Sequence, residues 1–370
     1  MKIAIIGGGI GGLTLALALR KEGHDCVVHE RTPQFGRVGA DINLTPNAVR
    51  ALDPLGVGEH LRAEAARPRF RISRDGYTGE ETSRLPMSDA AEEAYGAPQL
   101  TIHRADLLDA LEAAVGSDAV RLGHGLEACE VTDGGVVSLR FADGSTDEAD
   151  VVVGADGIHS AVRRSLLGEE HPEFTGTVAY RAVLPTERVA HLPGTDCFTK
   201  FWGKDRYTQI VTFPLTRGEE TFVFATEHRE SWSEESWTTP GRIEDLRAAY
   251  ADFHEDARAL LDACDDVLIS ALYVRDPLTT WGRGGATLIG DAAHPMMPFM
   301  AQGAGQAIED AVVLARCLSA HGAPEGLRLY ESVRQERTAQ IQVGSRGNEW
   351  LKAGGNADWV YGYDAWEVAI

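Results

Sequence analysis

The chain has 370 residues, long enough to bury a sizeable core, and two lobes are expected from that length. Its formal net charge of -21 argues against nucleic-acid binding, because phosphates need a basic face, although a local basic pocket for a small anion stays compatible with it. The five cysteines are odd in number and scattered, which favours reduced thiols in a cytoplasmic protein over a disulfide framework or a zinc site. No apolar run approaches the roughly 20 residues of a membrane span, and the histidines lack metal-ligand spacing, so neither a membrane nor a metal partner is expected.

The N-terminal segment predicts a βαβ unit. Residues 2–6 are a short apolar run, typical of a strand buried on both faces, and a helix over 10–21 and a strand over 26–29 follow. Further along, the patterns predict a helix around 46–55, a polar irregular stretch over 68–97, a strand over 100–102, a helix over 104–115, short strands between 120 and 149, and a buried strand over 151–153.

The second half of the chain predicts an antiparallel sheet followed by further α/β elements. The expected elements are strands over 177–184, 197–202, 208–213 and 221–226, a helical stretch over 241–264, a strand over 286–289, and long helices over 303–318 and 327–343. An antiparallel sheet can bury one face and present it to a ligand. The fold class is therefore α/β with an α+β insert, a Rossmann-like nucleotide-binding domain interleaved with an antiparallel-sheet substrate domain. We place the first domain at 1–70, 98–175 and 265–345, the second at 71–97 and 176–264, and a C-terminal tail at 346–370.

The first of three glycine-and-acid motifs joins the first strand to the first helix. In the loop that contains Gly7, Gly9, Ile10, Gly11 and Gly12, the first glycine allows the tight turn, the second lets a pyrophosphate approach, and the last lets the helix pack on the strand. The helix N-terminus then stabilises phosphates. Glu30, followed by Arg31, ends the second strand, where a carboxylate accepts hydrogen bonds from an adenosine ribose. The sequence therefore predicts a bound dinucleotide.

The other two motifs favour FAD over NAD. Gly154-Ala155-Asp156-Gly157 ends one buried strand, and Gly290-Asp291 ends another, at the carboxyl ends where open α/β sheets bind ligands. The long helix that begins at Gly303 and Ala304 can stabilise negative charge on a reduced flavin, although a plain capping turn also explains this segment.

The order of these motifs resembles that of the single-component FAD-dependent aromatic hydroxylases, the para-hydroxybenzoate and salicylate hydroxylase family, over essentially the whole chain. The resemblance implies that the first motif binds the ADP half of FAD, that Asp291 holds the ribityl chain, and that Asp156 contacts FAD and NAD(P)H. It also implies flavin contacts by Arg104 and by the Arg37 loop, and a backbone contact of Leu126 on the adenine side.

A closer similarity is to the 6-hydroxynicotinate 3-monooxygenase subgroup, whose members hydroxylate the ring carbon that bears a carboxylate. It rests on three segments, Ser73-Arg74-Asp75-Gly76-x-Thr78-Gly79, Thr101-Ile102-His103-Arg104 and Trp359-Val360-Tyr361-Gly362-Tyr363-Asp364. The chain departs from this subgroup where the substrate is expected. Asn43 stands where the subgroup has a histidine, Tyr207 and Val211 stand where it has a histidine and a tyrosine, and Asp41 replaces a glycine. The exact substrate is therefore left open.

The chemistry that the resemblance implies is attack by a flavin hydroperoxide on an electron-rich ring, which needs a hydroxyl or amino substituent and an acceptor for its proton. Tyr207, Asn43 and Asp41 are the catalytic candidates in that order. Packing on the sheet explains Tyr207 equally well, and Asp41 fits either an acceptor role or a solvated position.

The expected substrate-pocket residues are Trp202, Val211, Arg181, Pro295 and Tyr361. Arg181 suits a bidentate carboxylate contact, with Lys200 as an alternative, although structural roles also account for both cations. Core packing explains the aromatic side chains as well.

These features predict an oxidoreductase that consumes NAD(P)H and dioxygen and hydroxylates a small aromatic carboxylate, with loss of the carboxylate. NADH is the first donor to test, and a monomer and a homodimer are both compatible with the sequence. The alternatives are a ring hydroxylase that keeps the carboxylate, acting on a phenol or a natural-product intermediate, and a non-catalytic flavin-binding redox sensor.

Overall fold

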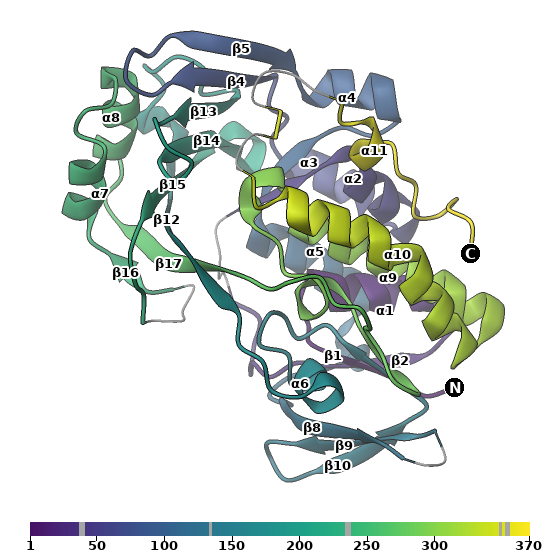
Figure 1. Cartoon of the computed structure of the whole chain (residues 1–370). Helices are drawn as coiled ribbons and strands as arrows, with labels where there is room; N and C mark the ends of the chain where they lie inside the picture. The colour runs from purple at the N-terminus through teal and green to yellow at the C-terminus, as the bar shows by residue number, and fades with distance from the viewer. Residues whose placement is uncertain (37–40, 133–134, 234–237, 348–349, 352–355) are drawn as a thin grey trace.

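The computed structural model describes residues 1–36, 41–132, 135–233, 238–347, 350–351 and 356–370, and in these ranges the strands form four sheets (Figure 1). No helix in the described ranges is both long and apolar enough to cross a membrane.

A parallel five-stranded sheet forms the nucleotide-binding half. Its strands, in spatial order, are β18 (Ala286–Leu288), β11 (Val151–Gly154), β1 (Ile3–Ile6), β2 (Cys26–His29) and β7 (Val120–Arg121). The central strands are buried because helices cover a parallel sheet. The covering helices are α1 (Ile10–Lys21), which packs against both α5 (Arg104–Val115) and α9 (Gly303–His321), and α10 (Glu325–Gly344), which lies on α9. The carboxyl ends of all these strands point to the same edge.

Smaller elements surround this sheet. They are the three-stranded sheet of β8 (Leu126–Val131), β9 (Val137–Phe141) and β10 (Thr146–Ala149), with α6 (Ala161–Leu167) on β8, the pair β3 (Asp41–Leu44) and β6 (Leu100–His103), and the helices α2 (Pro46–Leu52) and α3 (Gly58–Glu64). The β3–β6 pair is tied to the large sheet, because the Thr101 hydroxyl donates a hydrogen bond of 2.6 Å to the Pro214 carbonyl.

The large sheet has eight strands and lies beside the parallel sheet (Figure 1). Their order is β16 (Pro240–Gly241), β17 (Val267–Val274), β12 (Glu173–Pro185), β15 (Glu220–His228), β14 (Gln209–Leu215), β13 (Phe198–Trp202), β4 (Phe70–Asp75) and β5 (Glu81–Pro86). All neighbours pair antiparallel except β13 and β4, which are parallel. Helices α7 (Ile243–Ala249) and α8 (Glu255–Asp262) cover one face through an apolar cluster, which leaves the other face for the nucleotide-binding half.

The predicted helices 10–21 and 104–115 and the strand 26–29 are confirmed with the same bounds. The expectation of an irregular stretch over 68–97 is wrong, because it forms β4, β5 and α4 (Ser88–Tyr95). Strand β5 lies at a sheet edge and leaves most of its polar side chains in water, so it lacks the apolar alternation of a half-buried strand. The large sheet also extends past the expected boundaries at 176 and 264, since β12 begins at Glu173 and β17 runs to Val274.

A buried charge network ties α9 to α10. The Arg334 guanidinium donates to Glu309 at 2.6 Å and to Asp310 at 2.8 Å, and all three side chains are fully buried. Arg337 also donates to Glu309, at 2.9 Å. Burial opposes the ionisation of Asp310, but His294 and Arg334 outweigh it and lower its pKa to about 2. The network therefore consists of ionised groups that compensate one another.

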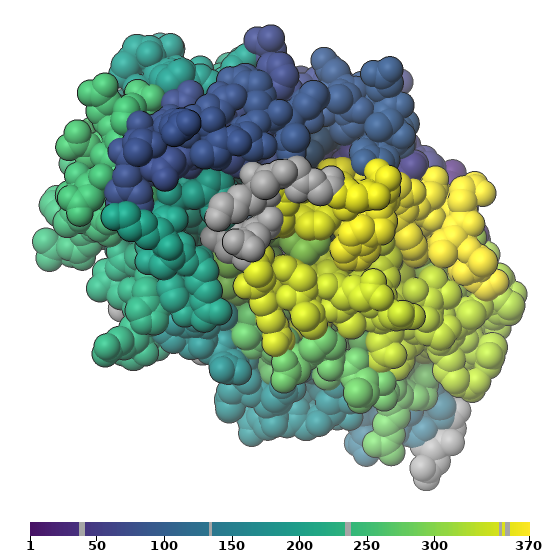
Figure 2. Space-filling view, turned by 45° about the horizontal axis from the view of Figure 1, so that its top comes forward, coloured from purple at the N-terminus to yellow at the C-terminus, as the bar shows by residue number. Residues whose placement is uncertain are grey.

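The C-terminal segment is held on the surface by arginines. It contains α11 (Asp358–Tyr361), and the guanidinium of Arg50 donates to the Tyr361 and Tyr363 carbonyls at 2.8 Å each. Arg337 donates to the Trp359 carbonyl at 2.6 Å. Figure 2 shows this segment, in yellow, beside the blue region of β4, β5 and α4. The tail is thus placed close to the large sheet.

We expect Arg334→Met to lower the free energy of unfolding by about 3–5 kcal/mol, because it leaves two buried carboxylates without their shared counter-charge. Arg328→Met on the same helix is the control, since Arg328 pairs with Glu325 on an exposed surface and its loss costs about 1 kcal/mol or less. Urea unfolding of both variants measures the difference, and equal effects would contradict the assigned role of the network.

Candidate active site

Of the three motif glycines in the loop after β1, only Gly9 has open space where a side chain would be. Gly7 has a φ of 109°, and an added Cβ would lie 2.4 Å from the Ala155 carbonyl oxygen. A Cβ on Gly12 would lie 2.0 Å from the Gly7 carbonyl oxygen. Gly9 has nothing within 4 Å of an added Cβ, and it precedes α1 without a side-chain cap. Two glycines therefore serve packing, and Gly9 leaves room for a phosphate at the uncapped N–H groups of Ile10 and Gly11.

Glu30 braces this loop from the end of β2. One carboxylate oxygen accepts from the Gly8 N–H at 2.7 Å, and the other accepts from the Thr32 N–H at 2.8 Å. Arg31 follows Glu30 in the chain. A Cβ added to Gly125, the residue directly before Leu126, would lie 3.1 Å from the Cβ of Arg31. The structure therefore brings Leu126, which is distant in the sequence, to the edge of the parallel sheet at which Glu30 and Arg31 lie.

Asp156 caps helix α6. Its carboxylate accepts from the Ser160 hydroxyl at 2.5 Å and from the Ala161 N–H at 2.7 Å. Burial raises the pKa of Asp156, and these hydrogen bonds partly offset that effect. Its observed partners thus shape the loop after β11, and a direct contact with FAD stays a prediction.

Asp291 follows the carboxyl end of β18. Its side chain reaches solvent, yet it is surrounded closely enough for burial to raise its pKa, with His294 and Arg104 acting in the opposite direction. Burial lowers the pKa of Arg104, and Asp291 and Glu30 counteract it. A Cβ on Gly303 would lie 4.0 Å from the Asp291 carboxylate. These groups therefore lie in one region at the carboxyl end of β18, where α9 also begins with no side-chain cap.

The groups of this region fit FAD as a set of donors and acceptors. An open glycine position, two uncapped helix N-termini and the acids Glu30 and Asp291 suit a pyrophosphate, a ribose and a polyol chain. Gly290 directly precedes Asp291, and α9 begins with Gly303 and Ala304. Contacts of these three residues with FAD stay predictions. Arg37 lies outside the described residues.

The face of the large sheet opposite α7 and α8 can be mapped from the strand register. One row across it contains Ser73, Lys200, Val211, Phe224 and Arg181. The next row contains Arg71, Phe198, Phe213, Phe222 and Val183. Met297, six residues after Asp291, belongs to the same apolar cluster as Phe198, Val211 and Phe213. This face therefore confronts the loop that follows Asp291, and we call it the inner face.

Asp41 and Arg181 lie near enough, at one end of the inner face, for their charges to act on each other. Burial raises the pKa of Asp41 to about 6, and the charge of Arg181 counteracts it. Burial also lowers the pKa of Arg181 to about 10, with Asp41 counteracting. Arg181 donates to the Ser270 hydroxyl at 2.5 Å and lies 5.5 Å from the Phe224 ring centroid. The carboxylate of Asp41 is thus an ionisable acceptor in an apolar, partly open site.

Asn43 lies two residues along β3, on the same side of the strand as Asp41. Its side-chain oxygen accepts from Gln99 at 2.9 Å, while its amide nitrogen is buried without a hydrogen-bond partner in the described structure. A buried amide nitrogen without a partner is a donor available to a ligand.

Tyr207 is not brought to this pair. Its hydroxyl accepts from the exposed Arg206 at 2.6 Å, and its ring lies 4.7 Å from that of His228, at the end of β15. Among the described residues, its side-chain contacts fit the packing role that the sequence left open, and a catalytic role stays a prediction.

The remaining pocket candidates fall at other edges of the inner face. The Lys200 ammonium lies 3.6 Å from the centroid of Trp202 and 5.9 Å from that of Phe299. Val211 is buried in the middle of its row. Pro295 lies buried in the loop after Asp291, where its carbonyl accepts from Gln342 at 3.2 Å. Tyr361 is buried near Arg71, and its hydroxyl acts to raise the pKa of that arginine.

Two residues of the inner face were not predicted from the sequence. Arg71 lies in a stretch that was expected to be irregular. Only the assignment of a strand there would have shown that Arg71 and Ser73, two residues apart, lie on the same face. Gln209 is fully buried and neither amide atom has a partner in the described structure. Nothing local marks a glutamine as a pocket residue.

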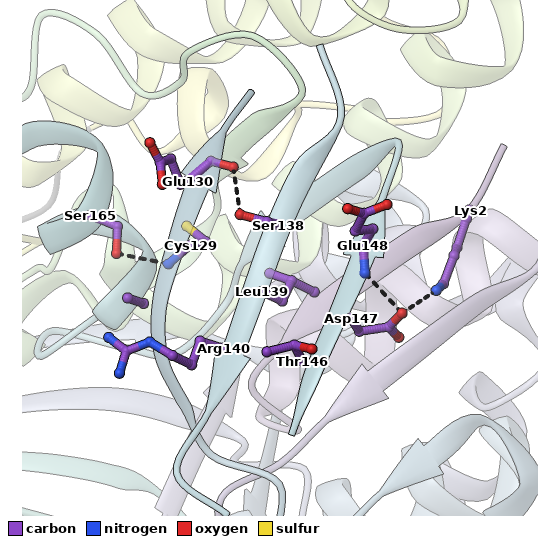
Figure 3. Close-up of a pocket in the computed structure, with 11 residues that line it drawn as sticks. Lys2, Cys129, Glu130, Ser138, Leu139, Arg140, Thr146, Asp147, Glu148 and Ser165 are labelled. Atoms are coloured by element: carbon purple, nitrogen blue, oxygen red, sulfur yellow. Dashed lines mark hydrogen bonds and ion pairs between the residues drawn. The ribbon is translucent and has the colours of Figure 1, made fainter. Parts of the chain in front are cut away.

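A separate surface cavity of about 940 Å³ lies over the three-stranded sheet (Figure 3). Its groups already pair with one another, since Lys2 donates to Asp147 at 2.5 Å and the Cys129 N–H donates to Ser165 at 3.1 Å. Lys2 precedes β1, so this cavity lies at the amino ends of the parallel strands. The motif loops follow the carboxyl ends, which excludes this cavity as the dinucleotide site.

Comparison with known proteins agrees with this geometry. The model of the FAD binding domain family matches residues 1–344. The chain belongs to this family of FAD-dependent aromatic monooxygenases.

Two curated relatives show the range of this flavoprotein family. The 6-hydroxynicotinate 3-monooxygenase of Bordetella bronchiseptica is 38% identical over 99% of this chain and 96% of its own length. The 3-amino-4-hydroxybenzoate 2-monooxygenase of Streptomyces cremeus is 39% identical over 94% of this chain and 86% of its own length. A solved salicylate hydroxylase substrate complex superimposes with a TM-score of 0.85 at 30% identity, covering 99% of this chain and 96% of that one. The flavoprotein monooxygenase fold, the FAD cofactor and the oxidoreductase class are thereby confirmed.

We expect Gly9→Ala to weaken FAD binding at least tenfold while the ligand-free protein keeps its unfolding midpoint, because the new methyl group occupies only the open space of the loop. Gly12→Ala should instead destabilise the ligand-free protein, since its Cβ meets the Gly7 carbonyl. Flavin fluorescence titration and thermal unfolding of the apoprotein distinguish the two. Unchanged FAD affinity in Gly9→Ala would show that the phosphates lie elsewhere.

Proposed function

We propose that this flavoprotein uses NAD(P)H and dioxygen to hydroxylate an aromatic carboxylate that carries a hydroxyl or amino group. The observation that carries the proposal is the Asp41–Arg181 pair at the end of an apolar, aromatic inner face. An acceptor with a raised pKa beside an apolar surface suits a ring whose substituent must give up a proton. The names of the curated relatives fit the same substrate class.

Bound FAD would supply the hydride acceptor and the activation of dioxygen, and Glu30, Arg104 and Asp291 are the residues that we expect to hold it. Asp41 would accept the proton from the ring substituent, and Arg181 would keep that carboxylate ionised. Asn43 would orient the substituent through its unpaired amide nitrogen. Val211, Phe213 and Phe224 would bind the ring and exclude water from the reacting atoms.

The fate of the carboxylate separates two forms of this proposal. In 6-hydroxynicotinate, carbon 3 bears the carboxylate, so hydroxylation there displaces it; in 3-amino-4-hydroxybenzoate, carbon 2 does not bear it. We propose the decarboxylating reaction, on the similarity of the segments around Ser73, His103 and Tyr361 to the first subgroup. The 39% identity to the second enzyme supports hydroxylation with retention as the alternative.

We propose the cytoplasm as the site of action and NADH as the first donor to test. All five cysteines are unpaired and buried, and burial raises the pKa of each thiol to about 11. Thiols in this state suit a reducing compartment.

We expect hydroxy- and aminobenzoates or 6-hydroxynicotinate to stimulate NADH oxidation by the FAD-loaded protein at least tenfold. Mass analysis of the product separates the two forms, because decarboxylation gives loss of carbon dioxide with gain of oxygen and retention gives gain of oxygen alone. A bound flavin that NADH does not reduce with any of these acids would instead support a redox sensor.

We expect kcat/KM for the aromatic acid to fall as the pH drops through about 6, because Asp41 accepts a proton only when ionised and protonation in this range removes the acceptor. Asp41→Asn should abolish this limb and lower kcat about 100-fold or more at pH 8. Asp118→Asn, on an exposed turn, is the control and should leave the profile unchanged. A limb that persists in Asp41→Asn would assign the acceptor role to another group.

A further inference from the structure

We propose that Arg71 binds the carboxylate of the aromatic substrate, at the opposite end of the inner face from the Asp41–Arg181 pair. This inference rests on the proposed function and assigns the orientation of the substrate in that site. The ring would lie over the apolar middle of the face, with its hydroxyl or amino group toward Asp41.

Arg71 is placed for this contact by the sheet register. It lies on β4, directly beside Phe198 on β13, in the row that continues through Phe213 and Phe222. Its guanidinium carbon lies 4.8 Å from the centroid of the Phe198 ring. Arg181 lies on β12, four strands away in the adjacent row. The two arginines therefore bracket the apolar part of one face.

Arg71 differs from its neighbours because no acidic side chain of the described residues pairs with it. Arg69 pairs with Asp196 at 3.1 Å, Arg74 pairs with Asp256 at 3.1 Å, and Arg84 pairs with Glu81 at 2.7 Å; each is an arginine of this edge of the sheet. The Arg71 Nη1 atom is buried, and in the described part of the chain it has no hydrogen-bond partner.

A buried cation without a counter-ion is costly, which favours a site whose anion is supplied by a ligand. Burial lowers the pKa of Arg71, and the group that counteracts this is the Tyr361 hydroxyl rather than a carboxylate.

The other two cations of the inner face are already compensated. The charge of the Asp41 carboxylate acts on Arg181, and Arg181 donates to Ser270, so a substrate carboxylate beside Arg181 would be repelled by a like charge. Lys200 lies against the faces of Trp202 and Phe299. Arg71 is therefore the cation of this face at which an added anion gains most.

The C-terminal segment completes the subsite. Tyr361 packs edge-on against Tyr95 with centroids 5.8 Å apart, and Arg50 holds both residues by their carbonyls, at 2.8 and 3.0 Å. Figure 2 shows this segment beside the region of β4 and β5. A guanidinium with an adjacent tyrosine hydroxyl is a donor set that suits a carboxylate. The tail thus closes the end of the site at which we place the acid group.

The test compares acids with their amides on the FAD-loaded protein. Probe pairs are 6-hydroxynicotinate with 6-hydroxynicotinamide and 4-hydroxybenzoate with 4-hydroxybenzamide, and binding is followed by the change in flavin absorption. The unmodified protein should bind at least one acid tenfold or more tightly than its amide. Arg71→Gln should weaken binding of that acid about 10- to 100-fold and change binding of the amide less than about threefold. Arg71→Lys should be intermediate, and Arg69→Gln, two residues away and paired on the surface, should leave both affinities unchanged.

A second variant keeps the test independent of activity. Arg71→Met removes a partly buried charge that pairs with no acid of the described residues, so it should raise the melting temperature of the ligand-free protein and abolish the further rise that the acid produces. A lower melting temperature in Arg71→Met would contradict the inference that the Arg71 guanidinium lacks a compensating charge in the ligand-free protein.

Retained preference for the acid in Arg71→Gln, with loss of that preference in Arg181→Gln, would overturn the assignment and leave the proposed function intact. If no aromatic acid binds to the unmodified protein or stimulates NADH oxidation, the proposed function fails and this assignment fails with it.

Discussion

The buried pairing of Arg334 with Glu309 and Asp310 fixes the parts of the molecule that meet at the site. Asp310 also accepts from the Gly290 N–H at 3.0 Å and from His294 at 2.6 Å, so it holds the loop that carries Asp291. Glu309 accepts from Asn47 at 2.6 Å, which ties α2, directly after β3, to the same helix. One ionised cluster, fully buried, therefore holds in place both the loop that carries Asp291 and the segment that follows the strand of Asp41.

The site itself follows from how charge is distributed around an apolar surface. The charges of Asp41 and Arg181 compensate each other at one end of the inner face, and Lys200 lies on aromatic rings at its edge. In the part of the chain that the structure describes, no acid pairs with Arg71. An aromatic ring with an acid at one end and a proton donor at the other is complementary to this arrangement. The polarity of the site thus favours one orientation of such a ring, without any contribution from the apolar side chains of Val211 and Phe213.

Much of the fold and of the cofactor loops was predictable from the sequence. The helices beginning at Ile10 and Arg104 have the expected bounds, because each follows a strand and a strong local helix-start signal. The loops at Gly7 and Gly290 are also local, since positive φ and close backbone approach select glycine directly. Ala301 shows the limit of this rule, because it has a φ of 54° without being a glycine. The stretch over 68–97 was missed because an edge strand with solvated side chains carries no apolar periodicity.

By itself, the sequence determined that the chain holds a dinucleotide at the ends of parallel strands, because glycine spacing and strand-terminal acids act over a few residues. Only the tertiary structure decided which charges meet. Asp41 and Arg181 come from different sheets, Tyr207 lies with Arg206 and His228 instead of with Asp41, and Asp156 caps α6. Arg69 and Arg74 pair with acids, whereas no acid in the described ranges pairs with Arg71. A strand pattern gives the face on which a side chain lies, but the group opposite it depends on the packing of segments that are distant in the chain.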